Sequence, residues 1–222
     1  MRQLLLDFTR APAPTFANFV HGRNAEPVHA LEAAARGEFG APVIYIWGES
    51  VAGKTHLLHA FAAASGAHYR HARDFAAFEG EGETVAIDDI EHLSDGAQAA
   101  IFNAFNERAF RLLVVAASAA PRDVALRRDL ATRLATGLTY RVLALSDEEK
   151  RAALGAHAKV RGFALDEDVS SYLLSHLRRD MGSLIAALDS LDRYSLETGR
   201  AITVPLLKDA LQMNLPQGGA GA

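Results

Sequence analysis

The stretch that decides the fold is Gly48-Glu-Ser-Val-Ala-Gly-Lys-Thr55, which fits the pattern G-x-x-x-x-G-K-[ST] in full. It follows an apolar run and precedes a helical pattern, as a phosphate-binding loop requires. Glycines at both ends let backbone N–H groups turn around an anion, and the helix start adds partial positive charge. Lys54 suits the outer phosphates and the Thr55 hydroxyl suits Mg²⁺. We expect a bound nucleoside di- or triphosphate to contact Gly48, Glu49, Ser50, Val51, Ala52, Gly53, Lys54, Thr55 and His56.

Outward from this loop, apolar strand-like runs alternate with helical patterns as far as about residue 145. The runs cover residues 43–47, 68–72, 84–88, 111–117 and 138–144. The helical patterns cover residues 26–36, 54–65, 73–78, 96–109 and 122–135. This alternation is typical of a parallel sheet covered by helices on both faces. We therefore predict an α/β nucleotide-binding domain over residues 15–145.

From Ser146 onward the pattern is purely helical. Ser146 and Glu149 fit the S-x-x-E pattern of a capping box at the start of a helix that runs to about residue 160. Further helices are predicted at residues 166–178, at residues 182–198 and from about residue 203. We expect a small all-helical domain over residues 146–214 and a flexible tail over residues 215–222.

The composition limits the function classes. The chain has 222 residues, half of them hydrophobic, so it can bury a substantial core. It contains no cysteine, which excludes disulfides and thiolate metal sites, and it shows no apolar run long enough for a membrane span or a signal peptide. The net charge of −4 does not favour an autonomous binder of duplex DNA. We expect a cytoplasmic protein that contacts DNA weakly at most.

The apolar run at residues 84–88 ends in two acids, Asp88 and Asp89. An acid at the carboxyl end of a strand beside a phosphate loop suits Mg²⁺, and a second acid can orient an attacking water. We therefore assign Asp88 to the metal, together with Thr55, and Asp89 to the water. The alternative is a solvated turn that carries acids with no further role.

Two further segments are ambiguous from their residues alone. Arg133 and the run Arg178-Arg179-Asp180-Met181 lie in helical patterns, where most arginines pair with nearby carboxylates in solvent. The first residues read Gln3-Leu-Leu-Leu-Asp-Phe8 and are followed by the proline-interrupted segment Thr9-Arg-Ala-Pro-Ala-Pro14. Residues 1–14 therefore predict a docking peptide with an extended tether, or alternatively a strand packed on the domain surface.

As a set, these segments resemble the AAA+ ATPases of the DnaA replication-initiator family. The resemblance rests on the phosphate loop, the two acids, Thr132-Arg-Leu134, the late Arg179-Asp-Met181 and the upstream Thr15-Phe-Ala-Asn-Phe-Val-His-Gly-Arg-Asn24. It covers about residues 14–213. It implies a parallel-sheet AAA+ core with a C-terminal all-helical lid domain, and ATP or ADP with Mg²⁺ as the bound group.

The resemblance also implies roles for single residues. Phe19, Val20 and Asn24 would border the adenine, and Arg179 would be the lid arginine that touches the nucleotide. Arg133 would be an arginine finger. Ser118 holds a polar sensor position where the family more often has Asp or Asn, so we expect weak intrinsic hydrolysis.

The sequence ends with the lid, where DnaA continues into a DNA-recognition domain. Its first residues resemble the Gln-Leu-x-Leu-x-Phe peptides that dock on the DNA sliding clamp, with Gln3, Leu4, Leu6 and Phe8 as the contacts. Together these features resemble the regulatory inactivators within the family, which use the clamp to stimulate ATP hydrolysis by the initiator and so prevent re-initiation. The alternative is a self-standing AAA+ motor or helicase loader that works as a homo-oligomer.

Two groups of residues suggest no function from spacing alone. His56 and His59, and likewise His68 and His71, lie close in sequence but lack a third ligand nearby, so no metal site is predicted. The run Glu79-Gly-Glu-Gly-Glu83 is interpreted as a solvated acidic turn.

Overall fold

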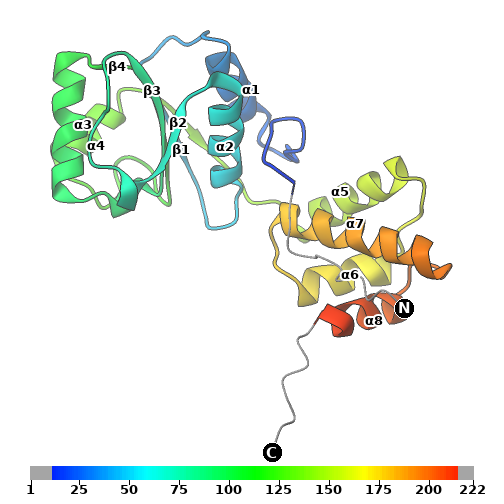
Figure 1. Cartoon of the computed structure of the whole chain (residues 1–222). Coiled ribbons are helices and arrows are strands. Elements are labelled where there is room, and N and C mark those ends of the chain that lie inside the picture. Colours follow the sequence, from blue (N-terminus) through cyan, green and yellow to red (C-terminus); the bar gives the residue numbers. More distant parts are fainter. Residues whose placement is uncertain (1–11, 215–222) are drawn as a thin grey trace, which may run out of the picture. The chain divides into compact units, whose positions relative to one another are not determined.

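The computed structural model describes residues 12–214 (Figure 1). The chain forms two compact units. We call the first, Pro14–Ala144, the core, and the second, which begins at Leu145, the lid. Each is described by itself below. No helix within residues 12–214 is long and apolar enough to cross a membrane.

The core is built on a five-stranded sheet in which every pairing is parallel, in the order β2-β3-β4-β1-β5. The strands are β1 (Val43–Trp47), β2 (His68–His71), β3 (Glu83–Asp88), β4 (Phe110–Ala117) and β5 (Leu138–Arg141). The carboxyl ends of all five strands therefore meet at one edge of the sheet. The phosphate loop follows β1 and the two acids end β3, so both lie at this edge.

Helices cover both faces of the sheet, with α1 and α2 on one side and α3 and α4 on the other (Figure 1). Their bounds are α1 (Ala25–Ala35), α2 (Lys54–Ser65), α3 (Asp95–Glu107) and α4 (Arg128–Leu134). Side chains of the central strands alternate between the two layers: Tyr45 and Val115 pack toward α3 and α4, whereas Ile46 and Val114 pack toward α1 and α2. The central strands are thus buried on both faces, which confirms the predicted fold class.

Three predicted elements differ from the structure because tertiary contacts override local pattern. Residues 73–78 form no α-helix, only a 3₁₀ turn at Ala72–Asp74. The rings of Phe75 and Phe78 instead pack edge to face at 5.4 Å, and Phe78 stacks on Phe110. A six-residue segment has too few internal hydrogen bonds to resist such packing.

The helix predicted over residues 122–135 and the strand predicted over residues 138–144 are both shorter. The buried Gln98 side chain accepts a hydrogen bond from the Arg127 N–H at 2.8 Å, which holds the chain extended just before α4. After β5, the Asn24 side chain bonds both backbone groups of Leu143. In each case a distant amide side chain takes the backbone groups that the predicted element would have used.

The lid contains four helices, α5 (Asp147–Val160), α6 (Glu167–His176), α7 (Met181–Thr198) and α8 (Val204–Asn214). The predicted capping box is confirmed, since Ser146 accepts from the Glu149 N–H and the Glu149 carboxylate accepts from the Ser146 N–H. One apolar cluster joins all four helices, and Leu184, Leu188 and Leu191 of α7 are fully buried in it. The lid therefore has a hydrophobic core of its own.

Candidate nucleotide site

The phosphate loop bends tightly between β1 and α2, and its glycines are sterically required. A Cβ atom at Gly48 would lie 2.1 Å from the carbonyl oxygen of Val142. Gly53 has φ +98° as the N-cap of α2, and a Cβ there would lie 2.8 Å from the Phe19 ring. Val51, at the exposed tip of the loop, has φ +64°, which is unusual for a β-branched residue. Backbone strain of this kind is typical of ligand-binding loops.

Lys54, the first residue of α2, lies across the loop. Its Nζ donates to the carbonyl oxygens of Gly48 at 2.8 Å and Glu49 at 2.9 Å, and the residue is 8% exposed. The ammonium group is thus held inside the loop, where the positive end of the α2 dipole also lies. Thr55, one residue further, is exposed, so its hydroxyl is accessible.

Asp88 ends β3 and is 2% exposed. The strand register aligns Ile87 of β3 and Tyr45 of β1 with the same residue of β4. Two strand spacings, about 10 Å, therefore separate β3 from the strand that leads into the phosphate loop. Asp88 lies on the same face of the sheet as α2, because Ala86, two residues earlier, packs there.

Tyr69 of β2 holds this buried acid. Its hydroxyl donates to Asp88 Oδ2 at 3.1 Å, while Asp88 Oδ1 accepts from the Asp89 N–H at 3.0 Å. The Tyr69 ring stacks on His59 of α2 with 3.9 Å between centroids. Burial, and then the charge of Asp88, raise the pKa of Tyr69, so the phenol stays protonated and donates. Sequence reasoning missed Tyr69 because only the β2–β3 register brings it beside Asp88.

Asp89 is oriented by His71, a second residue that the sequence did not reveal. Asp89 has φ +52°, and its Oδ2 lies 3.3 Å from His71 Nε2. His71 Nδ1 accepts from the Arg73 N–H at 3.2 Å, so the ring proton of neutral His71 resides on Nε2 and points to Asp89. Asp89 is thus paired with His71 and is directed toward β2.

Ser118 comes directly after β4 and is exposed. Its N–H donates to Glu91 Oε1 at 3.0 Å, whereas Glu91 Oε2 is buried and has no hydrogen-bond partner among the described residues. Glu91 lies in the 3₁₀ turn Ile90–His92 that follows the two acids. The structure therefore links the end of β3 to the end of β4 through Glu91.

The residues assigned to the adenine separate into two kinds. Phe19 covers Gly53, and its ring lies 5.4 Å from that of His56, so it borders the phosphate loop; Val20 follows it and is half-buried. Asn24 is 1% exposed, and its amide donates to Leu143 O at 2.9 Å and accepts from Leu143 N at 2.7 Å. The polar atoms of Asn24 therefore fasten α1 to the segment after β5.

His56 joins the segment before α1 to helix α2. Its Nε2 donates to the carbonyl oxygen of Thr15 at 2.9 Å. Burial lowers the pKa of His56, and the hydrogen bond to Thr15 opposes this effect in part. The contact places residues 15–19 beside the first turn of α2.

Arg133 lies on the surface of the core, on α4. Its Nη2 donates to Asn106 Oδ1 at 3.3 Å, and its guanidinium carbon lies 5.9 Å from the centre of the Phe102 ring. Both partners belong to α3. The residue is exposed, and no carboxylate among residues 12–214 forms an ion pair with it.

Arg179 belongs to the lid, in the segment between α6 and α7. Its Nη2 donates to Asp147 Oδ1 in the first turn of α5, and this hydrogen bond lowers the pKa of Asp147. Its assignment to the nucleotide stays a prediction. Gln3, Leu4, Leu6 and Phe8 lie outside the described residues.

The residues present fit a magnesium nucleotide. The loop offers the enclosed ammonium of Lys54, the accessible hydroxyl of Thr55 and glycines at positions where a side chain would not fit. Strand β3 offers the buried carboxylate of Asp88, which the Tyr69 hydroxyl holds. These are the donor types that bind phosphates and a hard cation. The core therefore carries a candidate nucleotide site at the carboxyl edge of its sheet.

Comparison with known structures identifies the fold as that of AAA+ proteins. The chain is similar to domain III of the Thermotoga maritima replication initiation protein DnaA, with 19% identity over 94% of this chain and 100% of that chain and a TM-score of 0.65. A replication initiator DnaA bound to AMPPCP and single-stranded DNA matches with 20% identity over 84% of this chain and 67% of that chain, with a TM-score of 0.65. The Thermotoga maritima RuvB Holliday junction branch migration motor matches with 17% identity over 96% and 76% of the two chains and a TM-score of 0.64.

Initiators and a branch migration motor thus share this fold. The lid of this chain gives a more specific match. Residues 147–211 match the family model described as "Hda, lid domain". This match covers all of α5, α6 and α7 and most of α8. The lid of this chain therefore matches the Hda lid domain, and the chain as a whole has the fold of DnaA domain III.

Proposed function

We propose that this chain is a nucleotide-bound regulator that docks on the DNA sliding clamp and stimulates ATP hydrolysis by a DnaA-type replication initiator. The match of residues 147–211 to the Hda lid domain carries the proposal. The complete phosphate loop and the exposed Arg133 add chemical support. Initiation of replication would be limited because the initiator is returned to its ADP form.

In this proposal the chain binds ADP or ATP through its own site. Backbone N–H groups of the loop and Lys54 hold the phosphates, and Thr55 and Asp88 hold Mg²⁺, with Tyr69 keeping the Asp88 carboxylate in place. Phe19 and Val20 cover the base. The cation would neutralise phosphate charge when bound.

Arg133 is the residue proposed to act on the partner. The α3 contacts with Asn106 and Phe102 hold its guanidinium at the surface, and no described carboxylate neutralises it. A guanidinium supplied in trans stabilises the charge that develops on a transferring phosphoryl group, an effect of roughly 10³ to 10⁵ in rate. The accelerated reaction then takes place on the nucleotide of the initiator.

The test is ATP hydrolysis by the initiator in the presence of clamp on DNA, with wild-type chain or the Arg133→Ala variant. The variant should keep nucleotide and clamp binding and lose nearly all stimulation, because only the charge at the surface is removed. Arg128→Ala is the matched control, since Arg128 is also exposed on α4 but points away from Arg133. Full stimulation by Arg133→Ala would remove this residue from the mechanism.

Clamp docking is tested separately by changing Gln3, Leu6 and Phe8 to alanine. Short apolar peptides of this kind bind with about micromolar affinity, and multivalent contact strengthens them. We expect the changed chain to keep nucleotide binding and to lose co-purification with the clamp. Undiminished clamp binding would exclude the peptide as the docking element.

A self-standing motor or helicase loader is the second candidate, favoured by the intact phosphate loop together with Asp88 and Asp89. In a motor, brisk steady-state hydrolysis would depend on Asp89 and on an arginine from a second copy. In the regulator, we expect slow turnover, because Asp89 is already paired with His71. Fast hydrolysis that is abolished by Asp89→Asn would favour the motor.

A further inference from the structure

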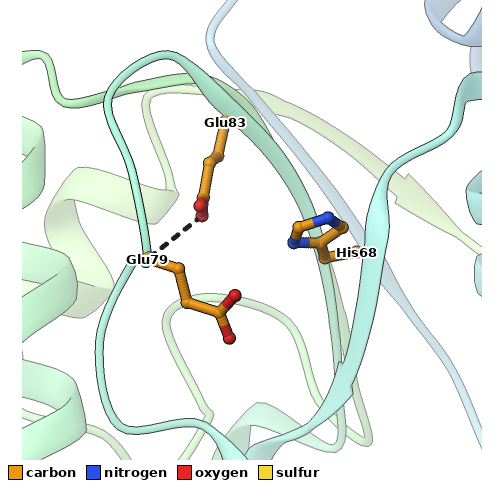
Figure 2. A group of neighbouring side chains, drawn as sticks. All are labelled: His68, Glu79 and Glu83. Carbon is orange, nitrogen blue, oxygen red and sulfur yellow. Dashed lines mark hydrogen bonds between the residues drawn. The ribbon is translucent and has the colours of Figure 1, made fainter.

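A second group of side chains that can bind a metal ion lies at the amino end of β3, opposite the end that carries Asp88. His68 begins β2, Glu83 begins β3, and Glu79 lies in the loop between them (Figure 2). One ligand atom from each of the three side chains lies within 4.8 Å of the others. From Glu83 to Asp88, β3 advances about 17 Å, so this group is distinct from the nucleotide site.

The fold explains why these side chains meet. Parallel pairing aligns His68 with Val85, which places Glu83 two residues from that level on the neighbouring strand. The loop then folds back: the Glu79 N–H donates to Glu83 Oε2 at 3.2 Å, and the Gly82 N–H donates to Ala109 O at 2.7 Å. These two hydrogen bonds hold the loop against the start of β3 and the residue before β4, and Arg70 of the edge strand β2 bonds Glu79.

Each carboxylate retains an oxygen for a ligand. Arg70 Nη2 donates to Glu79 Oε1 at 2.8 Å, and Glu83 uses Oε2 for the Glu79 N–H. Glu79 Oε2 and Glu83 Oε1 remain. The side chains also border a hollow of about 10 Å³, enough for one water-sized occupant. Its lining is completed by Arg70, Phe75, Ala77 and Val85.

We propose that His68, Glu79 and Glu83 bind one divalent transition-metal ion, with zinc as the matching probe. One imidazole and two carboxylates form a three-ligand set with room for a water as the fourth, the arrangement that tetrahedral zinc accepts. An imidazole ligand disfavours magnesium. The two negative charges exceed the single positive charge of Arg70, so the group attracts a dication. The bound ion fastens the loop over residues 75–82 to the edge strand β2.

The experiment is calorimetric titration of the full chain with zinc chloride, with and without magnesium ADP. We expect one zinc ion to bind per chain, and we expect magnesium ADP to leave the affinity for zinc unchanged. His68→Ala and Glu83→Gln should each weaken zinc binding roughly tenfold or more, since each removes a direct ligand. Glutamine at position 83 can still accept the Glu79 N–H bond, so this variant keeps the loop contact.

Two kinds of control keep the result interpretable. Glu81→Gln changes an exposed acid of the same loop and His29→Ala changes an exposed histidine of α1, and both should bind zinc like the wild type. Arg70→Gln removes the cation that competes for Glu79 and should tighten zinc binding, an outcome that misfolding cannot produce. Equal losses in the Glu81→Gln and Glu83→Gln variants, or no zinc binding by the wild type, would overturn the proposal.

Discussion

The two ends of β3 carry similar chemistry but differ in how they are assembled. At the carboxyl end, Asp88 lies at the same sheet edge as a phosphate loop whose eight residues are consecutive in the chain. At the amino end, Glu83 meets His68 and Glu79, and fifteen positions separate the first of these from the last. The first group is enclosed and sterically constrained, whereas the second is open to solvent in part.

This difference shows that a site leaves a recognisable sequence motif only when its geometry is set by residues close together in the chain. The phosphate loop is defined by backbone geometry within one turn, so particular residue types are required at fixed spacing. The group at the amino end depends on strand register and on a folded-back loop, and these leave no fixed spacing. Four substitutions test this contrast, and they are ordered here by expected effect.

Gly48→Ala should have the largest effect on stability. The new Cβ would lie 2.1 Å from the backbone oxygen of Val142, and neither backbone segment can move freely within the sheet edge. We expect the free energy of unfolding to fall by about 3 kcal/mol or more. Gly80→Ala, in the loop at the other end of β3, meets only a flexible Glu83 side chain at 3.4 Å and should be nearly neutral. Urea denaturation of both variants measures the contrast, and equal losses would contradict it.

Lys54→Ala should weaken the binding of magnesium ADP by about 100-fold, which is about 2.7 kcal/mol. The enclosed ammonium is lost, and with it the charge proposed to face the phosphates. Fluorescence titration with a labelled nucleotide measures the change. Arg70→Gln changes a side chain that reaches Glu79 and not the phosphate loop, so it serves as the control and should leave nucleotide affinity unchanged.

Asn24→Ala should lower the free energy of unfolding by about 2 kcal/mol. The buried amide bonds both the N–H and the carbonyl oxygen of Leu143, and alanine leaves both backbone groups unpaired. Asn18→Ala, at a half-buried residue that exchanges hydrogen bonds with Thr15, should cost less. If Asn24→Ala weakened nucleotide binding while leaving stability intact, Asn24 would belong to the base pocket instead.

Tyr69→Phe should have the smallest effect, about 1 kcal/mol in the free energy of binding the magnesium nucleotide. The ring and its stacking on His59 are kept, while the hydrogen bond to Asp88 Oδ2 is lost. We expect weaker magnesium dependence of nucleotide binding with little change in thermal stability. His59→Ala should act in the same direction if the stacked ring positions the phenol. Unchanged magnesium dependence in Tyr69→Phe would show that Asp88 needs no such support.

Much of the fold was predictable because its signals are local. The apolar run at residues 43–47 and the helix at residues 54–65 match β1 and α2 as observed, and the capping box at Ser146 forms as its spacing predicts. The failures are the short segment 73–78, which is held by aromatic packing, and two segments whose backbone is bonded by a distant side chain. Gln98 shortens α4 and Asn24 ends the strand pairing after β5, and no local pattern reveals either contact.

By itself, the sequence determined the phosphate loop, the alternation of strands and helices, and the change to a helical lid. These follow from steric rules and hydrophobic periodicity that act over a few residues. Only the tertiary structure decided that Tyr69 holds Asp88, that His71 pairs with Asp89, and that His68 meets two glutamates. Those contacts depend on the β2–β3 register, which is set by packing across the whole sheet and so cannot be read from any one segment.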